Sequence, residues 1–230
     1  MKRLFSALFF LLFVVAKILP VTVYCDTPFI KKFISEAVIS TIFTDDISKA
    51  EISFVNGLTI KKIPKNTHDY TVGIENVVLH GAKTNTDVIY SFKNFKIILS
   101  NITEVLALYY PDDEKKFKLL YKKYIQKIDA IQKAIVVPKR VFFRFGYRFD
   151  YLFDDFKLKY IDVDESFVSR EKAFRDLNVT TIHVCEPMPE NMKKGIDSLQ
   201  AGYLFVDIGY TDTSTDILEI LKNVMEEVRR

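Results

Sequence analysis

An alternating aromatic run within Val141–Val163 constrains the fold of this chain more than any other feature. Every second residue from Phe143 to Phe153 is aromatic, and mostly polar residues lie between them. The six rings belong to Phe143, Phe145, Tyr147, Phe149, Tyr151 and Phe153. A period of two places them on one face of a strand. Asp154 and Asp155 break the phase before a second alternating run, so we predict an aromatic β-hairpin.

The N-terminus has the features of an export signal. Lys2 and Arg3 precede an uncharged apolar run, Leu4–Ala16. This run is shorter than the roughly 20 apolar residues that cross a bilayer, which favours a secretory signal over a transmembrane helix. We expect a signal peptide at residues 1–25, with either cleavage after Cys25 or lipidation of Cys25. An uncleaved membrane anchor is the alternative.

Composition limits the classes of function. The chain has 33 basic and 30 acidic residues, and residues 1–25 hold three of the basic ones, so the exported part carries 30 of each. A neutral chain argues against nucleic-acid binding, which depends on positive charge. Hydrophobic residues make up 49% and charged residues 27%, as in a packed globular domain. Cys25 and Cys185 are the two cysteines, so disulfides do not build this fold.

Periodicity predicts the remaining elements. Thr27 and Pro28 resemble the start of a helix, and Glu51–Leu99 alternates with a period of two, which predicts an antiparallel meander. Further predicted helices begin near Pro111 and, after a capping box, near Ile217. Between them we predict a strand at 179–185 and a central strand at 203–210. These elements predict a single α+β domain over residues 26–230, in which amphipathic helices pack on a mainly antiparallel β-sheet.

The aromatic face has three interpretations. It is buried core, or it lines a pocket for an apolar ligand, or it forms a surface that docks a partner. Part of the predicted meander, Ile52–Leu99, also resembles in pattern the strand pairs of lipid-handling modules outside the cytoplasm. Our first hypothesis is therefore an exported, non-enzymatic module that binds an apolar or lipid-like ligand, without a cofactor. The alternative is a protein-interaction domain that docks on an envelope protein or a membrane surface.

The sequence also contains residues that could serve in catalysis, metal binding or glycosylation. His183 and Cys185 share one face of a predicted strand, as an imidazole and a thiol nucleophile would, which gives a third hypothesis of a cysteine-dependent enzyme. The three histidines are scattered without metal-ligand spacing, so we predict no metal site. Asn101 and Asn178 begin Asn-x-Thr tripeptides, which accept N-glycans if the host is a eukaryote.

Overall fold

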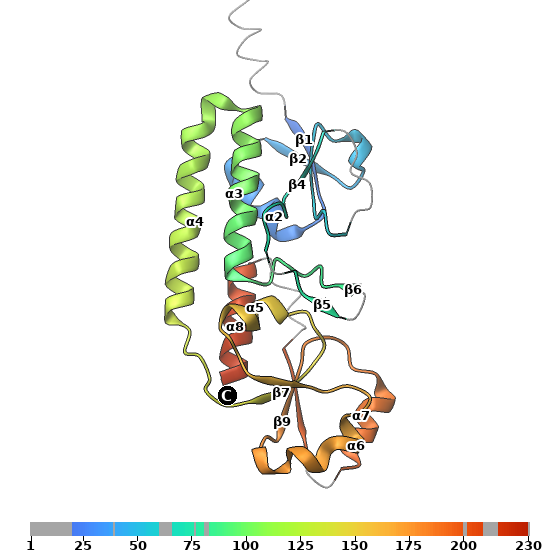
Figure 1. Ribbon diagram of the computed structural model, residues 1–230. Coiled ribbons are helices and arrows are strands. Elements are labelled where there is room, and N and C mark those ends of the chain that lie inside the picture. The colour runs from blue at the N-terminus through green and yellow to red at the C-terminus, as the bar shows by residue number, and fades with distance from the viewer. Residues whose placement is uncertain are drawn as a thin grey trace, which may run out of the picture. The chain divides into compact units, whose positions relative to one another are not determined.

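The computed structural model describes residues 20–38, 40–59, 66–75, 77–80, 83–199, 202–208 and 216–229, with the backbone alone at residues 79, 80, 175 and 176. Figure 1 shows the arrangement of its helices and strands. Contacts divide the chain into two compact units: unit 1 comprises residues 1–72 and 101–120, and unit 2 comprises 73–100 and 121–230. The division falls within two long helices, α3 (Phe92–Tyr109) and α4 (Glu114–Ala134).

Unit 1 contains a four-stranded parallel sheet with the strand order β2-β1-β3-β4. Its strands are β1 (Val21–Cys25), β2 (Thr41–Thr44), β3 (Ile52–Val55) and β4 (Thr67–Asp69). The helical elements are α2 (Pro28–Ala37) and the short 3-10 helices η1 (Ile47–Lys49) and η2 (Pro111–Asp113). Helix α2 returns the chain from β1 to β2, the connection that parallel strands need. The predicted helix start at Thr27 and Pro28 is confirmed, since Pro28 is the first residue of α2.

The interior of unit 1 depends on β1. This strand pairs with β2 on one side and with β3 on the other, and its Val23 and Cys25 are buried. All four residues of β3 are buried as well. Helix α2 covers the sheet with an apolar stripe that includes Ile30 and Phe33, as its helical spacing predicts. The residues predicted to end the leader, 21–25, therefore form a strand with neighbours on both sides.

Unit 2 has a second four-stranded parallel sheet, with the order β10-β9-β7-β8. Its strands are β7 (Phe142–Phe145), β8 (Tyr160–Asp162), β9 (Thr181–Val184) and β10 (Leu204–Asp207). A two-stranded antiparallel pair consists of β5 (Leu79–His80) and β6 (Lys83–Thr84). The helices are α5 (Asp150–Asp155), α6 (Phe167–Arg170), η3 (Glu171–Leu177), α7 (Glu190–Asp197) and α8 (Ile217–Arg229).

Alternation along β7 separates two buried layers in unit 2. Phe143 packs with Phe167 and Tyr203, at ring-centroid distances of 5.2 and 5.8 Å, in a core cluster that also includes Ile182 and Ile196. Residues 142 and 144 point to the opposite face. The Phe142 ring there contacts the rings of Phe153 and His183, each with centroids 5.4 Å apart. Both faces of β7 are therefore covered, as is typical of parallel sheets.

The prediction of a mainly antiparallel α+β fold is wrong, because both four-stranded sheets are parallel and helical segments connect most of their consecutive strands. The predicted meander at Glu51–Leu99 contains β3 and β4, which run parallel to each other, and the first part of α3. Ile98, Ile102 and Leu106 of α3 are buried at helical spacing. The brief alternation at the start of α3 therefore gives way to the helical period over its 18 residues.

The predicted aromatic hairpin is also wrong. Strand β7 ends at Phe145, and Gly146, with a φ of +88°, turns the chain toward α5. Strand β8 then runs parallel to β7. Phe149 and Phe153 are four residues apart at and within α5, where this spacing places them on one helical face. The second half of the alternating run is thus helix rather than strand.

Other predicted elements have mixed outcomes. The helices at α4 and α8 and the strand at β9 are confirmed. Strand β10 exists, but it lies at the edge of its sheet, so the predicted central position is wrong. Among the residues described, no helix is long and apolar enough to cross a membrane. The apolar run of the predicted leader, Leu4–Ala16, lies outside those residues.

Candidate functional site

The carboxyl edge of the unit 2 sheet is the place where the fold directs a ligand, because open parallel sheets bind ligands beyond the carboxyl ends of their strands. These ends are Phe145 of β7, Asp162 of β8, Val184 of β9 and Asp207 of β10. Charged and polar side chains gather there. We call this group the Arg144 cluster; it consists of Asn85, Asp87, Arg144, Tyr147, Arg148, Asp150, Asp162 and Glu186.

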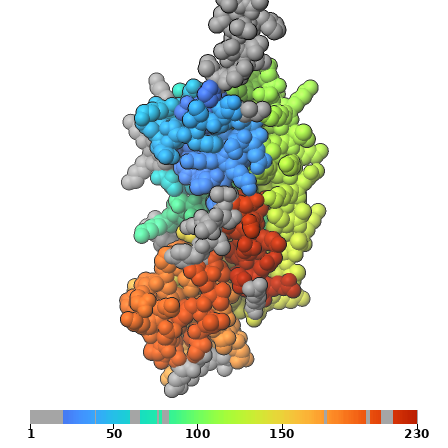
Figure 2. Space-filling model, turned by 180° about the vertical axis from the view of Figure 1, so that it is seen from behind, coloured from blue at the N-terminus to red at the C-terminus, as the bar shows by residue number. Residues whose placement is uncertain are grey.

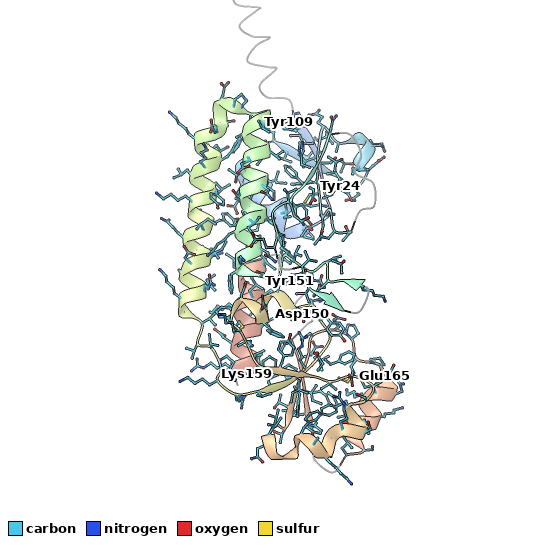
Figure 3. All side chains as sticks on the ribbon, in the orientation of Figure 1. Tyr24, Tyr109, Asp150, Tyr151, Lys159 and Glu165 are labelled. Carbon is cyan, nitrogen blue, oxygen red and sulfur yellow. The ribbon has the colours of Figure 1, made fainter. Side chains whose placement is uncertain are left out.

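Arg144 lies at the centre of this cluster and is 1% exposed. Its Nε donates to Asp162 Oδ1 at 2.7 Å, and its Nη1 donates to Asp150 Oδ1. Strand register explains the first contact, since Arg144 of β7 is paired with Asp162 of β8. Asp150 is the first residue of α5 (Figure 3). The guanidinium carbon also lies 3.7 Å from the centroid of the Tyr160 ring, a cation–π contact.

The charge of Arg144 is retained despite its burial. Burial opposes the charged form, but the carboxylates of Asp150 and Asp162 more than offset this and raise the pKa of the guanidinium above its ordinary value. Arginine is charged in proteins at every ordinary pH, so the edge of this sheet holds a permanent cation.

Hydrogen bonds fix the side chains of Asn85, Asp150 and Glu186 in the cluster. Asn85 Nδ2 donates to the backbone oxygen of Tyr147 at 2.7 Å and to Asp150 Oδ2 at 3.2 Å. Both oxygens of Asp150 therefore accept hydrogen bonds. Glu186 Oε1 accepts from the backbone nitrogen of Tyr147 at 2.7 Å. A Cβ atom at Gly146 would lie 2.8 Å from Glu186 Cβ and 3.0 Å from its backbone nitrogen, so this close approach requires glycine.

Asp87 has a perturbed carboxyl group at the margin of the cluster. Partial burial raises its pKa, the nearby charge of Arg148 opposes this rise, and the carboxylates of Glu186 and Asp150 add to it. The net direction is upward. Repulsion among carboxylates is thus present at this edge even with two arginines in place.

The described residues do not form a metal site. Transition-metal ions are held by histidine, cysteine and carboxylate side chains, and no group of three or more of these is positioned to hold an ion among the described residues. In the Arg144 cluster, the carboxylates of Asp150 and Asp162 are bound to the guanidinium. Its positive charge would also repel a divalent cation at such short range. As it stands, the cluster does not fit a metal ion.

The histidines lie apart from the cluster's hydrogen bonds. His68 of β4 pairs its Nε2 with the Tyr109 hydroxyl at 3.1 Å, and burial lowers its pKa. The side chain of His80 lies outside what the structure describes. His183 is 2% exposed, and burial, with a smaller effect from Arg140, lowers its pKa to about 4. Its Nδ1 has no hydrogen-bond partner among the described residues.

The predicted pair of His183 and Cys185 is not arranged as a nucleophile and its base. Cys185 is fully buried, and burial raises the pKa of its thiol, so the sulfur stays protonated. The hydrogen bond of this sulfur goes to the backbone oxygen of His183 rather than to the imidazole. A protonated, inaccessible thiol does not act as a nucleophile.

Carboxylates at the carboxyl edge of the unit 1 sheet stabilise loops. Asp26 Oδ2 accepts from the backbone nitrogen of Asn56 at 2.8 Å, and Asp26 Oδ1 accepts from the Tyr70 hydroxyl at 2.9 Å. Asp69 Oδ1 accepts from the backbone nitrogens of Gly57 at 3.0 Å and Thr71 at 2.7 Å. These bonds fix the chain where the strands end.

The six aromatic residues do not share a face. Phe143, Phe149 and Phe153 are core residues, and the buried Tyr151 donates its hydroxyl to the backbone oxygen of Asn85 at 2.8 Å (Figure 3). Tyr147 is 38% exposed, and Phe145 is partly buried against the core cluster. A cavity of about 360 Å³ lies instead between the C-terminal half of α4 and α8, which are side by side in Figure 2.

The modification sites also have structural positions. Cys25 is 2% exposed within β1, and burial raises the pKa of its thiol to about 12. Asn101 lies in α3, where its side-chain nitrogen donates to the backbone oxygens of Tyr70 at 2.9 Å and Val72 at 2.8 Å. A glycan on this nitrogen would disrupt both bonds. Asn178 is exposed before β9, with a φ of +50°.

Sequence reasoning missed the Arg144 cluster because its members are spread over a hundred residues. One signal was present: Arg144 and Asp150 are charged residues within a strongly apolar run. The period of two assigned them to an exposed face. A parallel arrangement of β7 and β8, which pairs Arg144 with Asp162, was needed to find the ion pair.

Comparison with known proteins resolves the family. The family model "ZnuA: Zinc-uptake complex component A periplasmic" matches residues 36–181, more than half of the chain. A crystal structure of ZnuA is similar with a TM-score of 0.73 and 14% identity, covering 91% of this chain and 98% of that chain. A zinc-bound ZnuA deletion mutant gives a TM-score of 0.74 and 14% identity, covering 91% and 97%.

A periplasmic metal-binding protein from Candidatus Liberibacter asiaticus is similar with a TM-score of 0.68 and 16% identity, covering 90% of this chain and 98% of that chain. Manganese-bound structures of it are similar as well. No curated protein sequence matches. These structural likenesses confirm the α/β fold with two parallel sheets.

The family corrects the hypotheses drawn from sequence. An apolar or lipid-like ligand is wrong, as is a docking domain for a membrane surface or envelope protein, because the matched family consists of zinc-uptake components. Proteins of this family are not enzymes, which confirms the non-enzymatic prediction. The predicted export is confirmed too, and the compartment is the periplasm. By the match over residues 36–181, this chain belongs to the ZnuA family of periplasmic zinc-uptake components.

Proposed function

We propose that this chain is the periplasmic metal-binding component of an ABC-type uptake transporter, with zinc or manganese as its cargo. The family match carries this proposal. Solved relatives of the same fold support both metals, since one is described with zinc bound and another with manganese bound. The partners would be the other components of the transporter.

The Arg144 cluster favours a second candidate, a family member whose ligand is not a divalent cation. Two of its carboxylates, those of Asp150 and Asp162, are already paired with the Arg144 guanidinium, and no group of three or more metal-ligating side chains is positioned to hold an ion among the described residues. Such a protein would retain the fold and the periplasmic compartment while binding another solute.

Metal titration separates the two candidates. The mature protein, without a histidine tag, is stripped with a chelator and titrated with Zn²⁺, Mn²⁺ and, as a control for nonspecific charge effects, Mg²⁺. The first candidate predicts one equivalent of Zn²⁺ or Mn²⁺ by calorimetry and elemental analysis. A hundredfold excess over Kd would then stabilise the fold by about 2.7 kcal/mol. Absence of binding at 100-micromolar metal, on the order of −5 kcal/mol or weaker, would overturn it.

A further inference from the structure

The first strand of unit 1 determines where the export leader can end. Strand β1 (Val21–Cys25) lies between β2 and β3 and pairs with both of them. We propose that the leader is cleaved between Ala16 and Lys17, so that the mature chain begins at Lys17 and keeps β1 whole. Cys25 is then an interior residue of the sheet and not a site of lipidation. This inference goes beyond the proposed function and is independent of the solute that the protein binds.

A cut after Cys25 would remove the strand that joins two others. Residues 21–24 pair with residues 41–44 of β2, and residues 23–25 pair with residues 52–54 of β3. Strands β2 and β3 are not neighbours in the sheet, so β1 is the link between them. Val23 and Cys25 are 1% and 2% exposed, and their loss would also leave part of the core unfilled. The leader must therefore end before Val21.

The surroundings of Cys25 leave no place for an attached lipid in the folded protein. Its sulfur donates to the backbone oxygen of Thr27 at 3.5 Å, and its side chain is buried. Acyl chains on this sulfur would have to pass through a close-packed interior. The next residue, Asp26, is fixed as well, since its carboxylate accepts from the backbone nitrogen of Asn56 at 2.8 Å and from the Tyr70 hydroxyl at 2.9 Å.

The sequence before β1 offers one suitable position for the cut. Secretory leaders are cleaved after an apolar run of roughly 7–15 residues, where compact residues stand directly before the cut and two positions earlier. Leu4–Val15 is such a run, and Ala16 and Val14 occupy those two positions. The other alanine and serine of residues 1–20, Ala7 and Ser6, lie near the start of the run. A cut there would leave most of the apolar run on the exported chain.

The proposed step is the hydrolysis of one peptide bond. Water adds across the bond between Ala16 and Lys17. Its hydroxyl becomes part of the new carboxylate on Ala16, and a proton goes to the nitrogen of Lys17, which becomes the α-amino group of the mature chain. Residues 17–20 separate this cut from the first residue of β1, so every pairing of that strand is kept.

The N-terminus of the exported protein tests the proposal directly. The full chain, with an affinity tag at its C-terminus, is expressed in a Gram-negative bacterium and recovered from the periplasm. Its free α-amino group is labelled under denaturing conditions, and the labelled peptide is identified by mass spectrometry. We expect an N-terminus at Lys17 and an unmodified Cys25. An N-terminus at Asp26, a retained Met1, any other first residue or an acylated Cys25 would overturn the proposal.

Two substitutions in the leader form a matched pair. Ala16→Leu places a bulky side chain directly before the cut, so the Lys17 N-terminus should be lost and the precursor should stay in the membrane fraction. Ala7→Leu makes the same change within the apolar run and should be processed as the wild type is. Equal processing of the two variants would contradict the assignment of Ala16.

A third variant tests the role of the cysteine. Cys25→Ala removes the only atom that a lipid could use, and it should leave both the Lys17 N-terminus and the recovery from the periplasm unchanged. The N-terminus is read from denatured protein, so a loss of stability in this variant does not affect the result. A shifted N-terminus, or a change in the fraction that holds the protein, would show that Cys25 is used in processing and would refute the proposal.

Discussion

Asp150→Asn should be strongly destabilising because it breaks a buried ion pair while preserving side-chain shape. The Asp150 side chain is 2% exposed and accepts from Arg144 and, at 3.2 Å, from Asn85. Breaking a buried pair by removing one partner costs about 3–5 kcal/mol. Asp162 remains to balance Arg144, so we expect the lower end, about 3 kcal/mol. Asp162→Asn is the matched comparison: its side chain is 45% exposed, and about 1 kcal/mol is expected.

Urea unfolding followed by far-ultraviolet circular dichroism measures both variants, since the chain has no tryptophan to serve as a fluorescent probe. With a slope of about 2 kcal/mol per molar urea, Asp150→Asn should lower the midpoint of the transition that includes unit 2 by about 1.5 M. Asp162→Asn should lower it by about 0.5 M. The reasoning fails if Asp150→Asn lies within 1 kcal/mol of the wild type, or if Asp162→Asn is the more damaging change.

Three further perturbations test other parts of the structure. Gly146→Ala should lower the free energy of unfolding by about 2–4 kcal/mol, because of backbone strain and the clash with Glu186. Gly202 also has a positive φ, but a Cβ there would meet no atom within 4 Å, so Gly202→Ala should lower it by about 1 kcal/mol. Equal losses of stability in thermal melting would contradict this explanation. The pKa of His183 is lowered to about 4 in the folded state, so between pH 6.5 and pH 4 the unfolded state binds a proton that the folded state does not. The free energy of unfolding should therefore fall by up to roughly 3 kcal/mol as the pH drops from about 6.5 to 4. His183→Leu should flatten this slope in urea titrations at several pH values, and an unchanged slope would exclude His183 as its origin. A chain that begins at Asp26 lacks β1, which pairs with both β2 and β3, so its circular dichroism spectrum should be that of an unfolded protein. Mass spectrometry of the exported protein should accordingly find an N-terminus before Val21 rather than at residue 26.

Sequence patterns predicted secondary structure correctly where they extend along one long element. Helices α4 and α8 have apolar stripes over several turns, and no other structure accommodates that spacing. The prediction of an aromatic hairpin from Phe143–Phe153 was wrong because a period of two over a short stretch also arises where a strand is followed by a helix. Phe143 faces one buried layer from β7, while Phe149 and Phe153 face another from α5. Gly146, which separates the two, was the local sign of that change.

Strand direction could not be read from the sequence, and the candidate site depends on it. The four strands of the parallel sheet in unit 2 come from segments separated by helices, and their parallel pairing is a long-range property. Only that pairing brings Arg144 beside Asp162 and turns Glu186 toward Tyr147. No short sequence motif of the ZnuA family was recognised in this chain either. The prediction of an exported location succeeded because it depended on the leader, which is read from a short stretch of sequence without knowledge of the fold.

The interleaving of the two units has a consequence for how this protein matures during export. Unit 1 takes its residues from two separate stretches, 1–72 and 101–120, and part of unit 2 is encoded between them. As the chain is translocated N-terminus first, the β1 to β4 sheet and α2 emerge early, but unit 1 lacks its portions of α3 and α4 until residue 120 has crossed. A polypeptide stalled near residue 100 would thus present an incompletely covered sheet to periplasmic chaperones and proteases. The order of its segments along the chain therefore determines the stage of export at which the protein is most accessible to proteases.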